Sequence, residues 1–151
     1  MISFKKNLCD YYKVWFLLIM STVLVACAGT GSREFSTIQP LLDDQSTTVV
    51  AVLRHIGYAN SGVLMDIRLD RKSIANLGDQ EMVAYPIEPG MHILEAEFSG
   101  LVAAAFAGEQ SINFEIEEGE KKYFVVQMRG GLVSNTVTLL EVTRSGFSSM
   151  L

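Results

Sequence analysis

Cysteine and tryptophan are nearly absent from this sequence of 151 residues, and where they occur excludes several kinds of site. The two cysteines, Cys9 and Cys27, and the single tryptophan, Trp15, all lie within the first 27 residues. Beyond Cys27 the chain therefore has no thiol for a disulfide bridge, a thiolate zinc site or cysteine catalysis. It also lacks the tryptophan on which sugar-stacking platforms often depend.

Positive charge is scarce as well, which limits the partners that the chain can bind. The sequence has 12 Lys and Arg against 17 Asp and Glu, a net charge of −5. Three of the lysines and one of the acids, Asp10, lie in residues 1–26, which leaves 9 basic and 16 acidic residues in the remainder. Because nucleic-acid-binding surfaces are basic, this balance excludes a nucleic acid as the partner.

The N-terminal segment has the pattern of an export signal. Three lysines precede an apolar run over residues 14–25, and small residues follow. A basic start, a short apolar middle and a small-residue cleavage site are typical of such signals. The ending Leu24-Val25-Ala26-Cys27 resembles that of bacterial lipoproteins, in which the cysteine is acylated and becomes the first residue of the mature chain. We therefore expect residues 1–26 to be a lipoprotein signal peptide and Cys27 to be the lipidation site.

Two other interpretations of this segment are open. An uncleaved transmembrane helix needs about 20 apolar residues, which is more than this run provides. A plain secretory signal cut after Ala26 prefers a small residue where Leu24 stands. Lipid on Cys27 predicts a membrane anchor, and Ala28 in the next position, by analogy with enterobacterial sorting, predicts the outer membrane with the body facing the periplasm.

The remainder of the chain divides into three parts. Residues 27–46 are rich in Gly, Ser, Thr and Asp and show no sustained periodicity, which predicts a flexible tether with a reach of about 25 Å. Within it, residues 34–42 are compatible with a short helical turn or with an extended edge. Residues 47–144 are expected to form the folded domain, and residues 145–151 a C-terminal tail.

Period-two alternation dominates the folded domain and predicts β structure. Val63, Met65, Ile67 and Leu69 share one face of a strand, while the residues between them share the other. The β-branched run from Thr47 to Arg54 is typical of a strand buried on both faces. About seven such strands, separated by turn residues, predict an all-β fold, an antiparallel sandwich of immunoglobulin-like or transthyretin-like type. Further strands are expected over residues 74–77, 81–87, 91–98, 112–116, 122–129 and 135–143.

Four short motifs resemble those of a known family. They are Asp66-Ile67-Arg68-Leu69-Asp70, the strand over residues 74–77, Pro89-Gly90-Met91-His92, and Gly119-Glu120-Lys121-Lys122-Tyr123. Their order is similar to Leu-Asp-Gly, Ile-Gly-x-Leu, Pro-Gly-x-His and Gly-Lys-x-Tyr in small bacterial lipoproteins that carry a domain of unknown function, related to PEGA-type β-sandwich modules. This chain departs from the pattern at Arg71, where the family has glycine. The resemblance implies a sandwich fold, a lipid anchor and structural roles for Pro89, Gly90, His92 and Tyr123, but no activity.

The candidate chemistry is sparse. His92 shares the parity of the apolar face of its strand and follows a Pro-Gly turn, which favours a structural histidine bonded to a turn carbonyl over a catalytic one. No G-x-S-x-G motif or paired histidine spacing occurs, so we predict no catalytic residue, no metal site and no cofactor. The acidic residues at positions 115–120 favour a solvated hairpin over a calcium site.

One apolar segment stands out from this polar surface. Residues 101–108 carry no charge and lie between two predicted strands, so they either cover the core or contact a partner, with Leu101, Val102 and Phe106 as the candidate contacts. The sequence as a whole predicts a non-catalytic binding or structural module that meets an envelope protein or a cell-wall component. The alternatives are a carrier of a small apolar ligand between the sheets and a His92-dependent enzyme.

Overall fold

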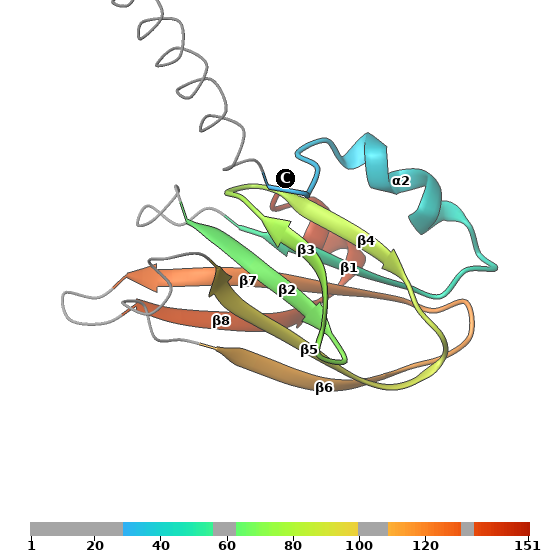
Figure 1. The fold of residues 1–151 in the computed structure, drawn as a ribbon. Coiled ribbons are helices and arrows are strands. Elements are labelled where there is room, and N and C mark those ends of the chain that lie inside the picture. Colours follow the sequence, from blue (N-terminus) through green and yellow to red (C-terminus); the bar gives the residue numbers. More distant parts are fainter. Residues whose placement is uncertain (1–28, 56–62, 100–108, 131–134) are drawn as a thin grey trace, which may run out of the picture.

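Eight strands and two short helices make up the described part of the computed structural model, which comprises residues 29–55, 63–99, 109–130 and 135–151 (Figure 1). Their order is α2 (Phe35–Asp43), β1 (Val49–Arg54), β2 (Leu64–Leu69), β3 (Lys72–Leu77), β4 (Met82–Pro86), β5 (Gly90–Ser99), β6 (Gln110–Ile116), β7 (Lys121–Gly130), β8 (Asn135–Val142) and α3 (Arg144–Ser148).

The strands form two four-stranded sheets that face each other. One sheet has the order β4-β1-β7-β8 and the other the order β3-β2-β5-β6. The all-β sandwich predicted from the sequence is confirmed, with one strand more than the expected seven. One strand pair departs from the predicted antiparallel arrangement, because β1 runs parallel to β7, with Val49 opposite Lys121 and Arg54 opposite Val126.

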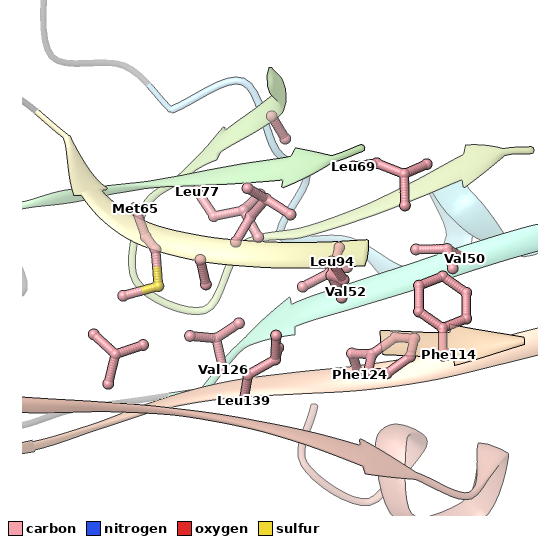
Figure 2. Packing of buried hydrophobic residues seen from close by; sticks show 14 of the residues in the cluster. Val50, Val52, Met65, Leu69, Leu77, Leu94, Phe114, Phe124, Val126 and Leu139 are labelled. Atoms are coloured by element: carbon pink, nitrogen blue, oxygen red, sulfur yellow. The ribbon is translucent and has the colours of Figure 1, made fainter. Parts of the chain in front are cut away.

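The space between the sheets is filled by apolar side chains of both inner faces (Figure 2). The alternation predicted for β2 is confirmed, because Met65, Ile67 and Leu69 all point into this core. The rings of Phe114 and Phe124, from opposite sheets, lie 5.0 Å apart between centroids. At that separation a tilted aromatic pair adds about 1 kcal/mol to the gain from burial.

A second apolar cluster covers the outer face of the β1 sheet. The side chains of Val49, Ala51 and Leu53 are buried there beneath Ile38 and Leu42 of α2 and Phe147 of α3, so β1 is buried on both faces, as its sequence predicted. The flexible tether predicted for residues 27–46 is therefore wrong for residues 29–46. The C-terminal tail predicted for residues 145–151 is wrong in the same way, since Phe147 is fully buried. An outer face of β-branched residues needs an apolar cover, and these two helices supply it.

The sandwich has two ends, which we name after residues located there. At the Arg54 end, β1, β5 and β7 finish and β2, β6 and β8 begin. The β3–β4 connection lies at this end too, since Leu53 pairs with Met82 and Met65 with Leu77. The turns at residues 70–71, 88–90 and 117–120 lie at the opposite, His92 end. Among the described residues, none of the helices has the length and hydropathy needed to cross a membrane.

Candidate functional site

The strained feature of the His92 end is the two-residue hairpin between β2 and β3. Asp70 and Arg71 both have positive φ, 50° and 67°, and Leu69 pairs with Lys72 across them. Such a turn matches the twist of the flanking strands, but it requires a left-handed backbone at both central positions. Aspartate tolerates this conformation, whereas arginine has no side chain suited to it. The hairpin is therefore tight even though Arg71 stands where the resembling family has glycine.

Asp70 ties this hairpin to the neighbouring strand. Its backbone N–H donates to the carbonyl of Ile93 at 2.9 Å, and its carboxylate Oδ1 accepts from the backbone N–H of Ile93 at 3.0 Å. The other carboxylate oxygen, Oδ2, lies 2.7 Å from Nδ1 of His92. One side chain therefore links β2, β5 and the histidine.

The His92 ring lies between two acceptors. Its Nε2 is 2.8 Å from the carbonyl oxygen of Glu88, directly before the Pro89-Gly90 turn, while Nδ1 faces the Asp70 carboxylate. A carbonyl and a carboxylate can only accept, so this geometry suits the protonated ring, in which both nitrogens donate. Burial by itself lowers the pKa of His92, but the hydrogen bonds to Asp70 and Glu88 and the Asp70 charge outweigh it and raise that pKa above its usual 6.5.

This arrangement leaves His92 little catalytic chemistry. Each ring nitrogen already faces an acceptor within the protein, so neither is placed to bind a metal or to meet a substrate. Its ring packs against Phe114 at 5.8 Å between centroids, as part of the core boundary. Across the described ranges, no group of three or more His, Cys, Asp and Glu side chains is arranged to hold a metal ion. The geometry joins the hairpin at residues 70–71 to the turn at residues 88–90.

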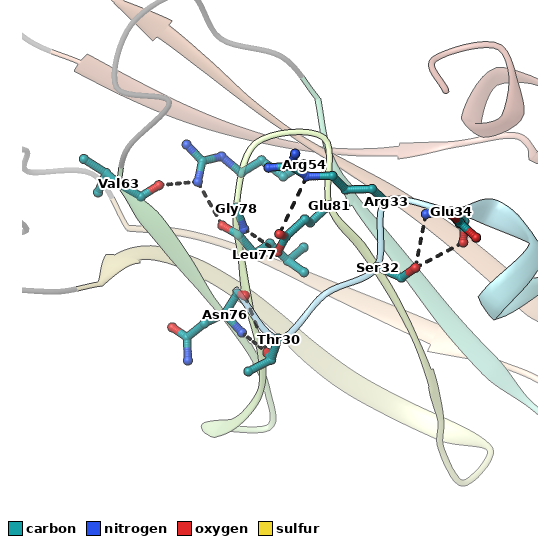
Figure 3. Close-up of polar contacts among 10 residues, drawn as sticks. All are labelled: Thr30, Ser32, Arg33, Glu34, Arg54, Val63, Asn76, Leu77, Gly78 and Glu81. Carbon is teal, nitrogen blue, oxygen red and sulfur yellow. Dashed lines mark hydrogen bonds and ion pairs between the residues drawn. The ribbon is translucent and has the colours of Figure 1, made fainter. Parts of the chain in front are cut away.

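A buried arginine marks the opposite end. The side chain of Arg54 is 2% exposed, and its Nη1 donates to the carbonyl of Leu77 at 2.9 Å and to the carbonyl of Val63. Desolvation lowers the pKa of Arg54, while the charges of Asp79 and Glu81 oppose that effect. The guanidinium thereby joins the last residues of β3 to the start of β2 (Figure 3).

A cavity of about 100 Å³ adjoins Arg54. Its lining is mixed in chemistry and comes from the ends of β1 and β4, the turn before β4, and the segments before α2 and after α3. Sites for organic ligands usually measure about 300–1,000 Å³, so this cavity has room for a few waters or a small ion. The described residues around it are Arg33, Leu53, Arg54, His55, Gln80, Met82, Met150 and Leu151.

The segment before α2 crosses this end of the sandwich as a strap, which we define as residues 29–33. Thr30 bonds to Asn76 of β3 (Figure 3), and Ser32 pairs with Met82 of β4. These are the edge strands of the two different sheets. The strap therefore satisfies backbone groups on both exposed edges, which would otherwise be open to pairing with another chain.

The residues singled out in the sequence lie in separate places. Pro89 and Gly90 form the turn beside His92, and Gly90 has a φ of 140° that favours glycine. Tyr123 lies on the far side of the β1 sheet, where its ring packs 5.4 Å from that of Phe147. Cys27 and the proposed partner contacts Leu101, Val102 and Phe106 lie outside the described residues.

The structural roles of two important residues were not predicted from the sequence. Asp70 was visible only as part of a turn motif, because its partner His92 is 22 residues away. Arg54 offered a clearer signal, since it is a charged residue that ends a strand expected to be buried on both faces. Such a charge must find partners, and the two carbonyls supply them.

Comparisons with known proteins assign no family. No family model matches the chain, and no curated protein matches it. Among solved structures, the NMR structure of a protein from Eubacterium rectale is similar over 68% of this chain and 96% of its own, with 9% identity and a TM-score of 0.39. A similarity at this level transfers neither family nor function.

Proposed function

We propose that this protein is a lipid-anchored envelope lipoprotein whose β-sandwich serves as a non-catalytic binding or structural module facing the periplasm. The observation that carries the proposal is the sequence Leu24-Val25-Ala26-Cys27 directly before the strap. The cysteine of the lipoprotein pattern stands two residues before Gly29, where the described fold begins. An acyl anchor at Cys27 would leave the whole domain on the periplasmic side of its membrane. The proposal includes the relationship to small bacterial lipoproteins with a domain of unknown function, which is supported by the turn motifs alone.

The state of His92 supports a non-catalytic role. Both of its ring nitrogens lie within 2.8 Å of oxygen atoms of the protein itself, so the histidine acts as a link between two turns. A general base needs a free nitrogen lone pair within reach of a substrate proton. The geometry therefore favours a binding or structural module over a His92-dependent enzyme.

The packing between the sheets favours the binding module over a carrier. A carrier requires an apolar cavity large enough for its ligand, of a few hundred Å³. The inner faces instead contribute sixteen buried residues that pack on one another, among them the Phe114–Phe124 pair. A ligand would have to displace this core, and each displaced large side chain would cost several kcal/mol.

Mass spectrometry of the N-terminal peptide from membrane-derived protein tests the proposal. We expect a mature chain that begins at Cys27 and carries acyl groups, and that is recovered in the outer-membrane fraction. The Cys27→Ser variant is the matched control, and it should stay unprocessed and lack the acyl mass. Several acyl chains, at about 0.8 kcal/mol per buried methylene, hold a protein stably on a bilayer. An unmodified thiol on Cys27, or wild-type protein released as freely soluble material, would contradict the proposal.

A further inference from the structure

We infer that the strap and the β3–β4 turn lie directly against the bilayer surface, with lipid headgroups as their contact partner. This inference rests on the proposed acylation of Cys27 and adds to it an orientation. A protein on a long tether samples all orientations relative to its membrane. A protein anchored through a segment that is bonded into its fold presents one end.

The strap is bonded into the fold from its first residues. The backbone N–H of Thr30 donates to the carbonyl of Asn76 at 2.8 Å, and the N–H of Asn76 donates to Oγ1 of Thr30 at 2.8 Å. Two residues later, Ser32 and Met82 exchange both backbone hydrogen bonds, at 2.8 and 2.7 Å. Four hydrogen bonds over three residues fix the direction of the chain across the β3–β4 connection.

Two glycines allow the strap to approach this closely. A Cβ added at Gly31 would lie 2.5 Å from Cδ2 of Leu77 and 2.9 Å from Cβ of Glu81, and one added at Gly29 would lie 2.9 Å from the backbone nitrogen of Gly78. No side chain fits at such distances, so glycine is required for the backbone to lie on the β3–β4 turn. The part of the strap nearest to Cys27 is thus seated at the Arg54 end.

The distance from the anchor to the fold is short. Cys27 is two residues from Gly29, and two residues span at most about 7 Å even when fully extended. An acylated cysteine has its backbone at the lipid–water boundary, so the β3–β4 turn would lie within about 10 Å of the headgroups. From Arg33 the chain continues as α2, whose nine residues cover about 14 Å and lead toward the His92 end.

One basic side chain of the strap is available to the headgroups. The side chain of Arg33 in the strap is 70% exposed, which leaves its guanidinium accessible to lipid phosphates beside its contact with Glu81. The exposed surface of the opposite end carries both signs of charge, with Arg71 and Lys72 on the same end as Glu88, Glu117 and Glu118, so the short connection to the strap and not net charge sets the orientation.

Single-tryptophan variants provide the test, because Trp15 lies in the signal and residues 27–151 contain no other tryptophan. Gln80→Trp puts an indole on the exposed β3–β4 turn, and Glu118→Trp puts one on the exposed turn at the His92 end. The two positions are about 20 Å apart along the strand direction. Met82, next to the β3–β4 turn, pairs with Leu53, and Lys121, next to the other turn, pairs with Val49, so four residues of β1 separate the two pairs and each turn extends beyond its pair. The acylated proteins are reconstituted into phosphatidylethanolamine–phosphatidylglycerol vesicles that contain a lipid with a nitroxide on its headgroup.

We expect headgroup nitroxides to quench the Gln80→Trp variant several times more strongly than the Glu118→Trp variant. A flexible insert of about 12 Gly and Ser residues between Ala28 and Gly29 is the matched control, because its reach of about 19 Å frees the domain from the bilayer while the acyl anchor stays. In that background the difference should disappear. Equal quenching of the two variants without the insert, or stronger quenching of Glu118→Trp, would overturn the inference.

Failure of the anchor and failure of the orientation can be told apart. The mass of the Cys27 peptide reports acylation in each preparation. Where that cysteine proves unmodified, the proposed function fails, and the orientation is measured on a chain that carries Cys9→Ser and Trp15→Phe and whose Cys27 thiol is coupled to a maleimide phospholipid. Quenching confined to the Gln80→Trp variant would then still support the strap geometry, and equal quenching would contradict it.

Discussion

Replacing Asp70 by asparagine should make the stability of this protein lose its dependence on pH near neutrality. Asparagine is a mild perturbation here, because it tolerates the left-handed backbone at this position. Its amide oxygen can still accept from the N–H of Ile93, as Oδ1 of Asp70 does. What the substitution removes is the negative charge 2.7 Å from Nδ1 of His92.

The expected loss is about 1 kcal/mol. A hydrogen bond between charged groups contributes about 1.5–3 kcal/mol when it is well protected from water. The His92 side chain is 14% exposed, but that of Asp70 is 51% exposed, so solvent screening reduces the value toward that of a surface pair. For a domain of this size, 1 kcal/mol corresponds to a decrease of about 4 °C in Tm.

The pH range follows from the two pKa shifts. The pKa of His92 is raised above 6.5 in the folded state, so its contribution is complete below about pH 6.5 and is lost as the pH rises through the folded value. Burial by itself raises the pKa of Asp70, but the hydrogen bonds from His92 and Ile93 and the positive charges nearby lower it below 3.8. Its contribution is present above pH 3.8 and is lost as the pH falls. The link is therefore strongest between about pH 4 and 6.5.

Urea unfolding near pH 5.5 and again near pH 8.5 measures this effect. Asp70→Asn should be less stable than the wild type at the lower pH, and the two should converge as the pH rises through the raised pKa of His92. NMR titration of the His92 ring, with His55→Gln to assign the second histidine, should show a lower pKa in the variant. The reasoning is refuted if the stability difference is the same at both pH values while the His92 titration does not move.

Three further changes test the packing and turn assignments by urea unfolding. Arg71→Gly should raise the free energy of unfolding by about 0.5–1 kcal/mol. Glycine removes the strain of the left-handed backbone, and this gain is larger than the loss from the greater entropy of the unfolded chain. The control Arg71→Ala should give no such gain. Arg54→Met should lower the free energy of unfolding by about 2–4 kcal/mol, because the carbonyl of Leu77 loses its buried donor. The control Arg33→Met, on the exposed strap, should change that free energy by no more than about 0.5 kcal/mol. Equal effects of the two substitutions would contradict the role of Arg54. Phe147→Ala should lower the free energy of unfolding by about 3 kcal/mol or more. An unchanged free energy of unfolding would mean that α3 does not cover the β1 sheet.

Strand positions were predictable from this sequence because each strand buries one face or both. The alternation of β5, with Leu94, Ala96 and Phe98 inside, follows directly from the period of a strand. The buried run of β1 was equally clear, since an uninterrupted β-branched segment fits a strand covered on two sides. What covers the second side was not predicted. The cover is α2, whose buried residues Ile38 and Leu42 stand four apart, but Pro40 and the polar flanks hide that spacing in so short a helix.

The candidate site was predictable only in part. His92 was expected to bond to a turn carbonyl, and its Nε2 does lie 2.8 Å from the carbonyl of Glu88, four residues away and so within reach of a local argument. Asp70 comes to the same ring from a different hairpin, and the pairing of Leu69 with Leu94 brings it there. No local pattern in the sequence encodes that register.

The sequence by itself determined the all-β class and the inward parity of the strands, because these depend on a period of two residues. The tertiary structure alone decided that β1 and β7 run parallel, that residues 29–46 pack on the sandwich, and that Asp70 and Arg54 hold its two ends. Each of these depends on contacts between residues distant in the chain. Such contacts are selected by the packing of whole faces and by the partners that buried polar groups require, and no short segment carries that information.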